Sequence, residues 1–253
     1  LEAMLPFLSE SFGNAGSIHA LGRAAKAAID RAREQVAVLH NADPRLIFFT
    51  SGGTESDNLA IRGVLEGAGR TRRRVLVSAV EHHAVLHAAE YVRKHEGADA
   101  RVLSVDAAGR VAVDELEALL EDMAAVVSVQ HVNNETGVVQ PIERIAELCA
   151  GRGVPFHTDA VQSAGRVPLD VRRMPVGLAA VSGHKLYAPK GVGACYVAKG
   201  VDFVPQAVGG AQERGRRAGT ENVAGIVALG LACELARTEM AAEMERLRRL
   251  RDR

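Results

Sequence analysis

Short runs of apolar residues alternate with helix-type patterns along most of the chain, and this alternation predicts the fold. Continuous runs of Val, Ile, Leu, Phe and Ala, without strict apolar–polar alternation, are typical of parallel strands that are buried on both faces. The predicted strands span residues 45–50, 73–79, 100–106, 124–132, 154–160, 177–183 and 193–199, and the predicted helices lie near 20–40, 55–67, 83–96, 113–121 and 141–152. We therefore predict an α/β fold: an open, mainly parallel seven-stranded sheet with helices on both faces.

The two ends of the chain lack the patterns that open and close such a fold. The first residues, LEAMLPFLSESFGNAGS, contain no leading strand. Residues 221–253 form one helical pattern with Thr220 as a candidate N-cap and no stop signal. A helix of about 30 residues is about 45 Å long, longer than one small domain needs. We expect an N-terminal arm over 1–20, a large domain over 21–220, and a long helix over 221–253 that leads to a small domain largely missing from this sequence.

Composition narrows the class of protein. The 253 residues are 47% hydrophobic and 25% charged, with 31 acidic and 31 basic side chains. These values are typical of a globular protein, and zero net charge gives no reason to expect nucleic acid as a partner. The apolar runs are too short to span a membrane, and no signal peptide is apparent. Cys149, Cys195 and Cys233 form no disulfide or metal spacing, so we expect small core residues in a reducing, cytoplasmic setting.

Glycines and polar side chains follow the predicted strands, at the edge where an open α/β sheet binds its ligands. The first strand leads into SGGTESDN, which contains Gly53 and Thr54. This loop is either a phosphate site at a helix N-terminus or a plain turn capped by Thr54. His82, after the second strand, either stacks on a flat ligand ring or caps a helix. His83 and His87 lie one helical turn apart, but no third ligand with suitable spacing is apparent, so we predict no metal site.

Three later strand ends carry amide, carboxyl, hydroxyl and amine groups. They are Asn133, Asn134 and Glu135 after 124–132, Asp159, Gln162 and Ser163 after 154–160, and Ser182, His184 and Lys185 after 177–183. Lys185 is either a solvated lysine or a nucleophile at the end of a buried strand. Together, a lysine that can form an imine, a carboxylate for a pyridine nitrogen, and hydroxyls beside a helix N-terminus are the components of a pyridoxal phosphate site.

Longer segments resemble the cysteine desulfurases of the NifS/IscS type, which are fold-type I pyridoxal phosphate enzymes of the class V aminotransferase group. The segments are SGGTESDN, EHHAVL, HVNNETGVVQPI, HTDAVQSAGRVPLD, SGHKLYAPKGVGACYV and GGAQERGRRAGTENV. They are collinear with the family, and the resemblance extends from FGNAGSIHALG to the last residue. It implies a homodimeric enzyme with shared active sites. Such an enzyme turns L-cysteine into L-alanine and leaves a persulfide sulfur on its own cysteine, for iron–sulfur scaffold or other acceptor proteins.

The resemblance also implies a role for each site residue. Lys185 would carry the cofactor as an internal aldimine, and His82 would stack on the ring; both would move protons. Asp159 would pair with the pyridine nitrogen, and Gln162 would hydrogen-bond the phenolic oxygen. The remaining residues would be Gly53, Thr54, Ser182 and His184 at the phosphate, Asn134 near the phenolic oxygen and the substrate carboxylate, and Thr220 at the phosphate of the neighbouring subunit.

Two parts of the family pattern are absent from this sequence. The catalytic cysteine and the arginine that clamps the substrate carboxylate belong to the C-terminal small domain. None of the three cysteines here matches the catalytic motif, so we expect these 253 residues alone to be inactive. Two alternatives share the same site residues: another class V enzyme, such as a selenocysteine lyase or an aminotransferase, and a catalytically inactive scaffold domain that binds the cofactor.

Overall fold

The computed structural model describes residues 1–120 and 124–253, and it confirms the α/β fold with a mainly parallel seven-stranded sheet. The strands are β1 (Ile47–Thr50), β2 (Arg74–Ser78), β3 (Asp99–Leu103), β4 (Ala124–Ser128), β5 (Phe156–Asp159), β6 (Leu178–Ser182) and β7 (Gly193–Val197). Their order in the sheet is β1-β7-β6-β5-β4-β2-β3. Neighbouring strands are parallel except around β7, which runs antiparallel to both β1 and β6. Each observed strand is shorter than its predicted range, because the flanking residues lie in turns, in a 3₁₀ helix or in irregular backbone.

The α-helices follow the predicted positions closely. They are α1 (Pro6–Ser9), α2 (Ala20–Leu39), α3 (Gly53–Asn58), α4 (Val64–Gly67), α5 (His83–His95), α6 (Val113–Leu119), α7 (Ile142–Gly151) and α8 (Val223–Arg251). A π-helical turn, Leu59–Gly63, joins α3 to α4 without a break. The predicted helix over 113–121 ends at Leu119, and its last predicted residue lies outside the described residues.

Two predicted N-caps are wrong. Thr54 already lies inside α3, and Gly52 is the N-cap. The backbone of Gly52 has φ of +151°, which glycine adopts readily and other residues rarely do, so the helix starts there. At α8 the cap is Asn222 and not Thr220, because the Asn222 side-chain oxygen accepts a hydrogen bond of 3.1 Å from the N–H of Gly225.

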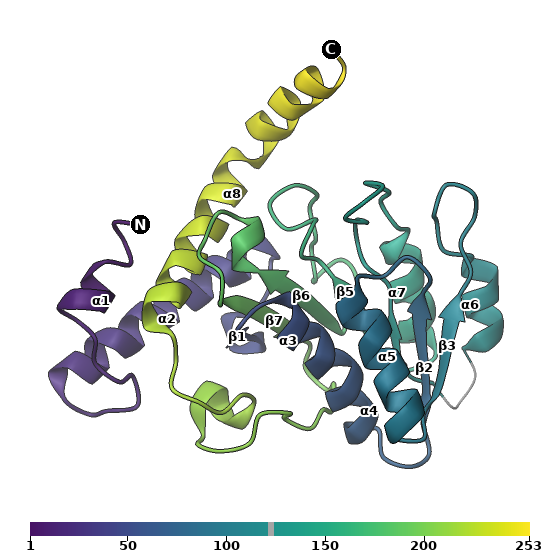
Figure 1. Cartoon of the computed structure of the whole chain (residues 1–253), viewed down its shortest axis with the longest axis horizontal. Coiled ribbons are helices and arrows are strands. Elements are labelled where there is room, and N and C mark those ends of the chain that lie inside the picture. The colour runs from purple at the N-terminus through teal and green to yellow at the C-terminus, as the bar shows by residue number, and fades with distance from the viewer. Residues whose placement is uncertain (121–123) are drawn as a thin grey trace.

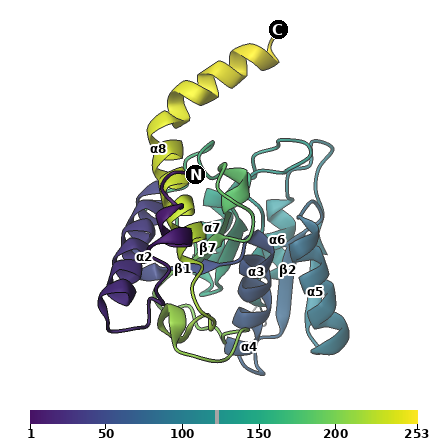
Figure 2. The ribbon, with the colours of Figure 1, turned by 60° about the vertical axis from the view of Figure 1, so that its left-hand side comes forward.

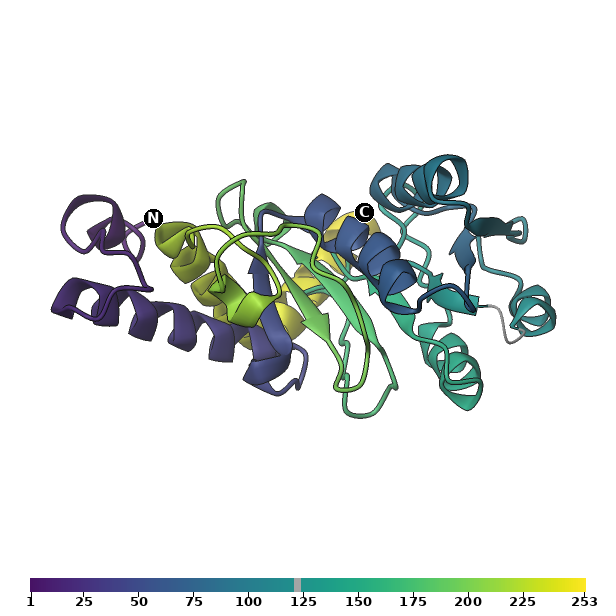
Figure 3. The same ribbon diagram turned by 90° about the horizontal axis from the view of Figure 1, so that it is seen from below.

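Helices cover both faces of the sheet, as the view from below shows (Figure 3). One apolar cluster joins the strands to the segment from α3 to α4 and to α5, and the other joins them to α2, α6, α7 and α8. Along β2, Val75 and Val77 belong to the first cluster and Leu76 to the second. Side chains alternate between faces along a strand, so a strand that is buried on both faces is apolar throughout. This burial explains the continuous apolar runs.

The last helix, α8, packs along α2 and then extends away from the sheet (Figures 1 and 2). It has 29 residues, and its buried residues all lie in the first half, the last of them being Cys233. No helix of residues 1–120 and 124–253 is long and apolar enough to cross a membrane.

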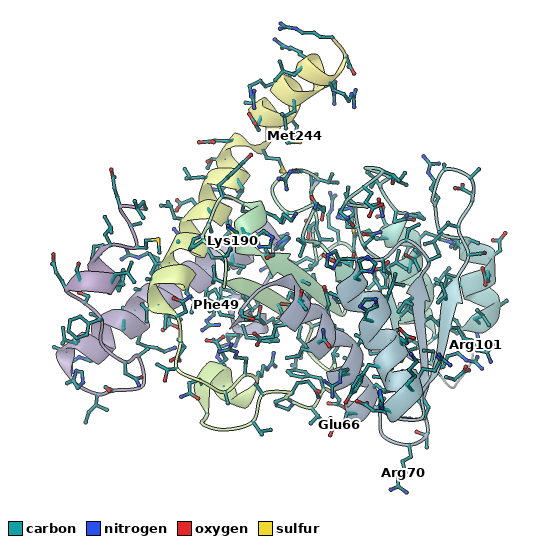
Figure 4. All side chains as sticks on the ribbon, in the orientation of Figure 1. Phe49, Glu66, Arg70, Arg101, Lys190 and Met244 are labelled. Atoms are coloured by element: carbon teal, nitrogen blue, oxygen red, sulfur yellow. The ribbon has the colours of Figure 1, made fainter. Side chains whose placement is uncertain are left out.

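The direction of the parallel strands gathers their carboxyl ends at one edge of the sheet. The segment that enters β2 lies at the opposite edge: Arg70, which precedes this strand, is at the bottom of Figure 4. The loops that follow β4 and β5 run along the top of the same view (Figure 1). The predicted site residues that follow the parallel strands belong to this upper edge.

Candidate cofactor site

Nine of the ten predicted site residues line one cavity of about 240 Å³ at the carboxyl edge of the sheet. They come from the start of α3, the N-cap of α5, the loop after β4, the end of β5 with the turn that follows, and the end of β6. They are Gly53, Thr54, His82, Asn134, Asp159, Gln162, Ser182, His184 and Lys185. The sheet therefore brings together side chains that are far apart in the sequence.

Thr220, the tenth predicted residue, does not line this cavity. It is exposed, shortly before α8, and borders a separate cavity of about 140 Å³ together with Ser51 and Gly191. Within one chain, Thr220 is thus not assembled with the other nine residues.

Lys185 lies at the boundary between two cavities. It ends a 3₁₀ turn, Gly183–Lys185, that follows the buried strand β6, and its side chain is half-buried. The guanidinium of Arg166 donates a 3.0 Å hydrogen bond to the Lys185 carbonyl and a 3.3 Å bond to the Gln162 carbonyl. Lys185 also borders a larger hollow of about 630 Å³ beside α8. The structure thus fixes the backbone of Lys185 and places the residue at the border of both cavities.

His82 both caps α5 and borders the cavity. The two interpretations of this residue from the sequence, a helix cap and a contact with a ligand ring, are therefore compatible. Its Nδ1 accepts a 3.1 Å hydrogen bond from the N–H of Ala84, at the first turn of the helix. A ring nitrogen that accepts a hydrogen bond carries no proton, so the neutral ring holds its proton on Nε2. The cap therefore fixes the tautomer of His82.

One wall of the cavity is rich in hydrogen-bond donors. It holds the hydroxyls of Thr54 and Ser182, and the Ser182 Oγ lies 2.9 Å from Nδ1 of His184. Burial lowers the pKa of His184, and the positive charges of the two neighbouring lysines lower it further. A Cβ atom at Gly53 would lie only 2.8 Å from Cγ2 of Val161, so a larger residue at the start of α3 would force a neighbour to shift. Such a wall suits an anion.

A carboxyl group also lines the cavity. Asp159 is buried at the end of β5, and its Oδ1 accepts a 2.8 Å hydrogen bond from the N–H of Val161. Burial raises the pKa of Asp159, and the hydrogen bond from Val161 and the charges of His82 and Lys185 act in the other direction. The site thus combines an amine, an acid and an anion-binding wall.

Sequence reasoning missed two polar residues that line the cavity, Asp57 and Gln130. Asp57 lies four positions after Gly53, and this spacing places both on one face of α3, which is the signal that could have found it. The backbone N–H of Gln130 donates a 2.8 Å hydrogen bond to Glu81, and its side-chain amide donates to the Val80 carbonyl. Gln130 therefore ties the loop that carries His82 to β4.

Other candidate groups lie outside the cavity. The rings of His83 and His87 are 5.1 Å apart, and no group of three potential metal ligands occurs within the described ranges. The three cysteines are free and buried, which confirms the expectation of core residues. Burial raises the pKa of Cys149 and of Cys233 to about 12, and it raises the pKa of Cys195 as well.

Comparison with known proteins agrees with this arrangement of residues. The family described as "Aminotransferase class-V" matches residues 1–253. "Cysteine desulfurase IscS" of Clostridium botulinum (strain Hall) is 46% identical over 253 residues, which are all of this chain and 64% of the relative. The protein of the same name from Methanosarcina thermophila is 46% identical, with 100% of this chain and 62% of the relative covered. The chain thus spans less than two thirds of the length of these relatives.

Solved structures agree as well. A structure titled "NIFS-LIKE PROTEIN" superposes with a TM-score of 0.96 at 37% identity, covering 99% of this chain and 69% of the other. One titled "SspA in complex with cysteine" gives a TM-score of 0.88 at 39% identity, with coverages of 92% and 67%. The chain therefore belongs to the class-V aminotransferase family, among the cysteine desulfurases of the NifS/IscS type.

Proposed function

We propose that the protein containing these 253 residues is a pyridoxal phosphate-dependent cysteine desulfurase that takes sulfur from L-cysteine and leaves L-alanine. The observation that carries this proposal is the convergence of Lys185, Asp159 and a donor-rich wall on one cavity. The names of the relatives, and a neighbour's title that reports a complex with cysteine, support the choice of substrate.

The residues of the cavity fit pyridoxal phosphate at both of its polar ends. Thr54, Ser182, His184 and the first N–H groups of α3 suit the phosphate, and Asp159 suits the nitrogen of a pyridine ring. Asp57 adds a buried carboxyl oxygen that has no hydrogen-bond partner among the described residues. When bound, this cofactor would supply an aldehyde that joins amines and an electron-poor ring that stabilises negative charge at the α-carbon of an amino acid.

Two side chains are suited to move protons at the substrate. Lys185 would hold the cofactor covalently, and after the substrate amine takes its place, the free Nζ can accept the α-proton. His82 keeps its proton on Nε2 because Nδ1 accepts from Ala84, so the ring can donate at Nε2. Gln162 and Asn134 would hydrogen-bond the phenolic oxygen of the cofactor, and Asn134 also the substrate carboxylate.

Transfer of sulfur needs a thiolate that attacks the sulfur of the substrate. The cysteines of this chain are buried with raised pKa values, so none of them supplies a thiolate near neutral pH. We assign the accepting cysteine to a part of the protein outside these residues. From its persulfide, an iron–sulfur scaffold or another acceptor protein in the cytoplasm would receive the sulfur.

We also propose that the protein is a homodimer with shared sites. Support comes from Thr220, which is exposed and lies apart from the cavity of its own chain. A hydroxyl in this position suits contact with the phosphate bound by a second copy.

The cofactor assignment is tested by chemical trapping. The chain incubated with pyridoxal phosphate should turn yellow, and borohydride reduction followed by peptide mapping should find the cofactor on Lys185. Lys185→Ala should lose the reducible chromophore and keep its circular dichroism spectrum. Recovery of reduced cofactor on another lysine would contradict the assignment; the candidates are Lys26, Lys94, Lys190 and Lys199.

The reaction assignment is tested on the longer protein that carries these residues. With L-cysteine and a thiol it should release alanine and sulfide in equal amounts. Pyruvate in place of alanine would indicate elimination and would rule out a desulfurase.

A further inference from the structure

A second carboxyl group, besides Asp159, lines the cavity. Asp57 lies on α3, is only 1% exposed and nevertheless lines the cavity. Its Oδ1 has no hydrogen-bond partner among the described residues. A buried carboxyl group without a partner is costly, so its presence at a ligand cavity calls for a functional explanation.

Asp57, His157 and Asp159 share one face of the sheet. His157 and Asp159 are two positions apart on β5, so their side chains project from the same face, whereas Phe156 packs in the cluster on the other face. Asp57 reaches this shared face from α3, and its Oδ1 lies 3.6 Å from Nε2 of His157. The other ring nitrogen, Nδ1, lies 2.8 Å from the hydroxyl of Ser128.

The titratable groups that face Asp57 from the elements around it are two carboxyl groups, an imidazole and a thiol. Asp159 on β5 and Glu81 before α5 are buried carboxyl groups, and together with burial they raise the pKa of Asp57. His157 is neutral, because burial lowers its pKa to about 3. Cys195 on β7 is a buried thiol with a raised pKa. Farther from Asp57, Lys185 and His82 act on Asp159, and Arg216 acts on Cys195.

We propose that Asp57 is a second carboxylate beside the nitrogen of the cofactor ring. Together with Asp159, it favours the binding of a ring with a positively charged nitrogen over the binding of a neutral ring of the same shape. The inference rests on the proposed cofactor. A positive charge above two buried carboxyl groups stabilises the ionised form of both, because opposite charges attract strongly where water is excluded. His157 lies beside this group: its Nδ1 is within hydrogen-bond distance of the Ser128 hydroxyl, whereas its Nε2 is 3.6 Å from Asp57 Oδ1, too far for a hydrogen bond. The Asp57 oxygen thus stays without a partner among the described residues.

The test compares two ligands that differ only at the ring nitrogen. Dissociation constants of pyridoxal phosphate and of 1-deazapyridoxal phosphate, in which C–H replaces that nitrogen, are measured by absorbance for the wild-type chain and Asp57→Asn. The preference of the wild type for pyridoxal phosphate should fall about 5- to 10-fold in Asp57→Asn, which is close to one pKa unit of charge stabilisation. Binding of the deaza compound should stay within about twofold of the wild type, since it carries no charge for Asp57 to stabilise.

Two variants control for the removal of a buried acid and for folding. Glu81→Gln removes another buried carboxyl group, whose pKa burial raises to about 8 but which does not line the cavity, and it should lower the preference less than Asp57→Asn does. If Asp57→Asn fails to fold by circular dichroism, Asp57→Ser replaces it, with the same expected ratio.

The possible outcomes separate the two proposals. Weaker binding of both ligands by the same factor would mean that Asp57 is only structural, and an unchanged preference would also overturn its role. A wild-type chain that binds both ligands equally would overturn the role of Asp57 and of Asp159 at the ring nitrogen. A wild-type chain that binds neither would instead refute the proposed cofactor.

Discussion

At the scale of single residues, buried histidines make the folded state sensitive to acid. Burial lowers the pKa of His40 and of His131 to about 4 and that of His157 to about 3. In an unfolded chain these rings have their ordinary pKa of about 6.5. Because the unfolded chain binds these protons first, the stability they contribute is complete above pH 6.5 and is lost as the pH falls toward 4.

His40 allows this effect to be measured away from the cavity. Between pH 7 and pH 4 the wild-type chain should lose about 3 kcal/mol of unfolding free energy through this one ring, at 1.36 kcal/mol per pKa unit. His40→Gln should lose correspondingly less over the same interval, as measured by urea denaturation. His95→Gln, at an exposed ring, serves as control and should follow the wild type. Equal pH dependence of His40→Gln and wild type would contradict the prediction.

Strand-end residues could be predicted as site candidates because a parallel sheet gathers the carboxyl ends of its strands at one edge. Their individual roles stay predictions. Asp57 could not be predicted, since it lies inside a helix and its burial depends on how α3 packs on β6 and β7. Lys185 shows the same limit: pattern alone leaves open whether a strand-end lysine is solvated, and only the neighbouring elements place it at a cavity.

At the scale of elements, a buried ion pair fixes the segment between β7 and α8. Arg33 on α2 donates hydrogen bonds of 2.7 and 2.8 Å to the two carboxylate oxygens of Glu213, and their side chains are 4% and 3% exposed. Glu213 also accepts from the N–H of Phe49, and Arg33 donates to the Ile47 carbonyl. Glu213 has φ of +46°, so this contact holds the backbone in the left-handed region. The pair anchors the segment that carries Thr220 to β1.

Removing Arg33 alone should lower the unfolding free energy more than removing both charges of the pair. Arg33→Met leaves a buried carboxylate without its partner, so the unfolding free energy should fall by about 3–5 kcal/mol. Adding Glu213→Gln removes that unpaired charge, so the double variant should be more stable than the sum of the single changes predicts. Urea denaturation of the four proteins measures the coupling.

An exposed pair provides the comparison. Arg246→Ala breaks the contact with Glu243 on α8 and should lower the unfolding free energy far less than Arg33→Met does, because solvent screens an exposed pair. Additive effects of Arg33→Met and Glu213→Gln would show that the two side chains do not act as a pair.

Helix and strand positions could be predicted from periodicity, but the exact starts of α3 and α8 could not. Thr54 and Thr220 have good capping preferences, and the structure uses Gly52 and Asn222. Several residues near each start can cap a helix, and the surrounding backbone selects one of them. The sharp turn at Gly52 and the side-chain oxygen of Asn222 decide these two positions.

At the scale of the whole molecule, we predict that these 253 residues bind the cofactor and do not turn over L-cysteine. Persulfide formation needs a thiolate that reaches the substrate, and the thiols of Cys149, Cys195 and Cys233 are buried in helices and a strand. Cofactor-loaded chain with L-cysteine and a thiol should give no catalytic release of sulfide or alanine.

A variant with all three cysteines replaced by alanine is the matched control. It should show the same low background as the unmodified chain. Sulfide release at catalytic rates by the chain, lost in the variant, would identify one of these cysteines as the sulfur acceptor.

The fold class could be predicted from the order of elements, but the order of strands in the sheet could not. Periodicity identifies each strand from its own residues, whereas pairing joins residues far apart in the chain. The antiparallel strand β7 illustrates this: it lies between β1 and β6, although nothing in its sequence, GACYV, states its direction or its neighbours.

The position of β7 also determines the order in which strands can pair while the chain is synthesised. β1 pairs with β7 alone, with Ile47 opposite Tyr196, so β1 leaves the ribosome long before its partner exists. Until Gly193–Val197 has emerged, a nascent chain presents the hydrogen-bonding groups of an apolar strand without a neighbour, which is the kind of edge that chaperones shield and that aggregation exploits. Strands β2 to β6 can assemble meanwhile, since each has a sheet neighbour among them. β1 is translated before the other six strands of this sheet and is therefore among the last to enter it.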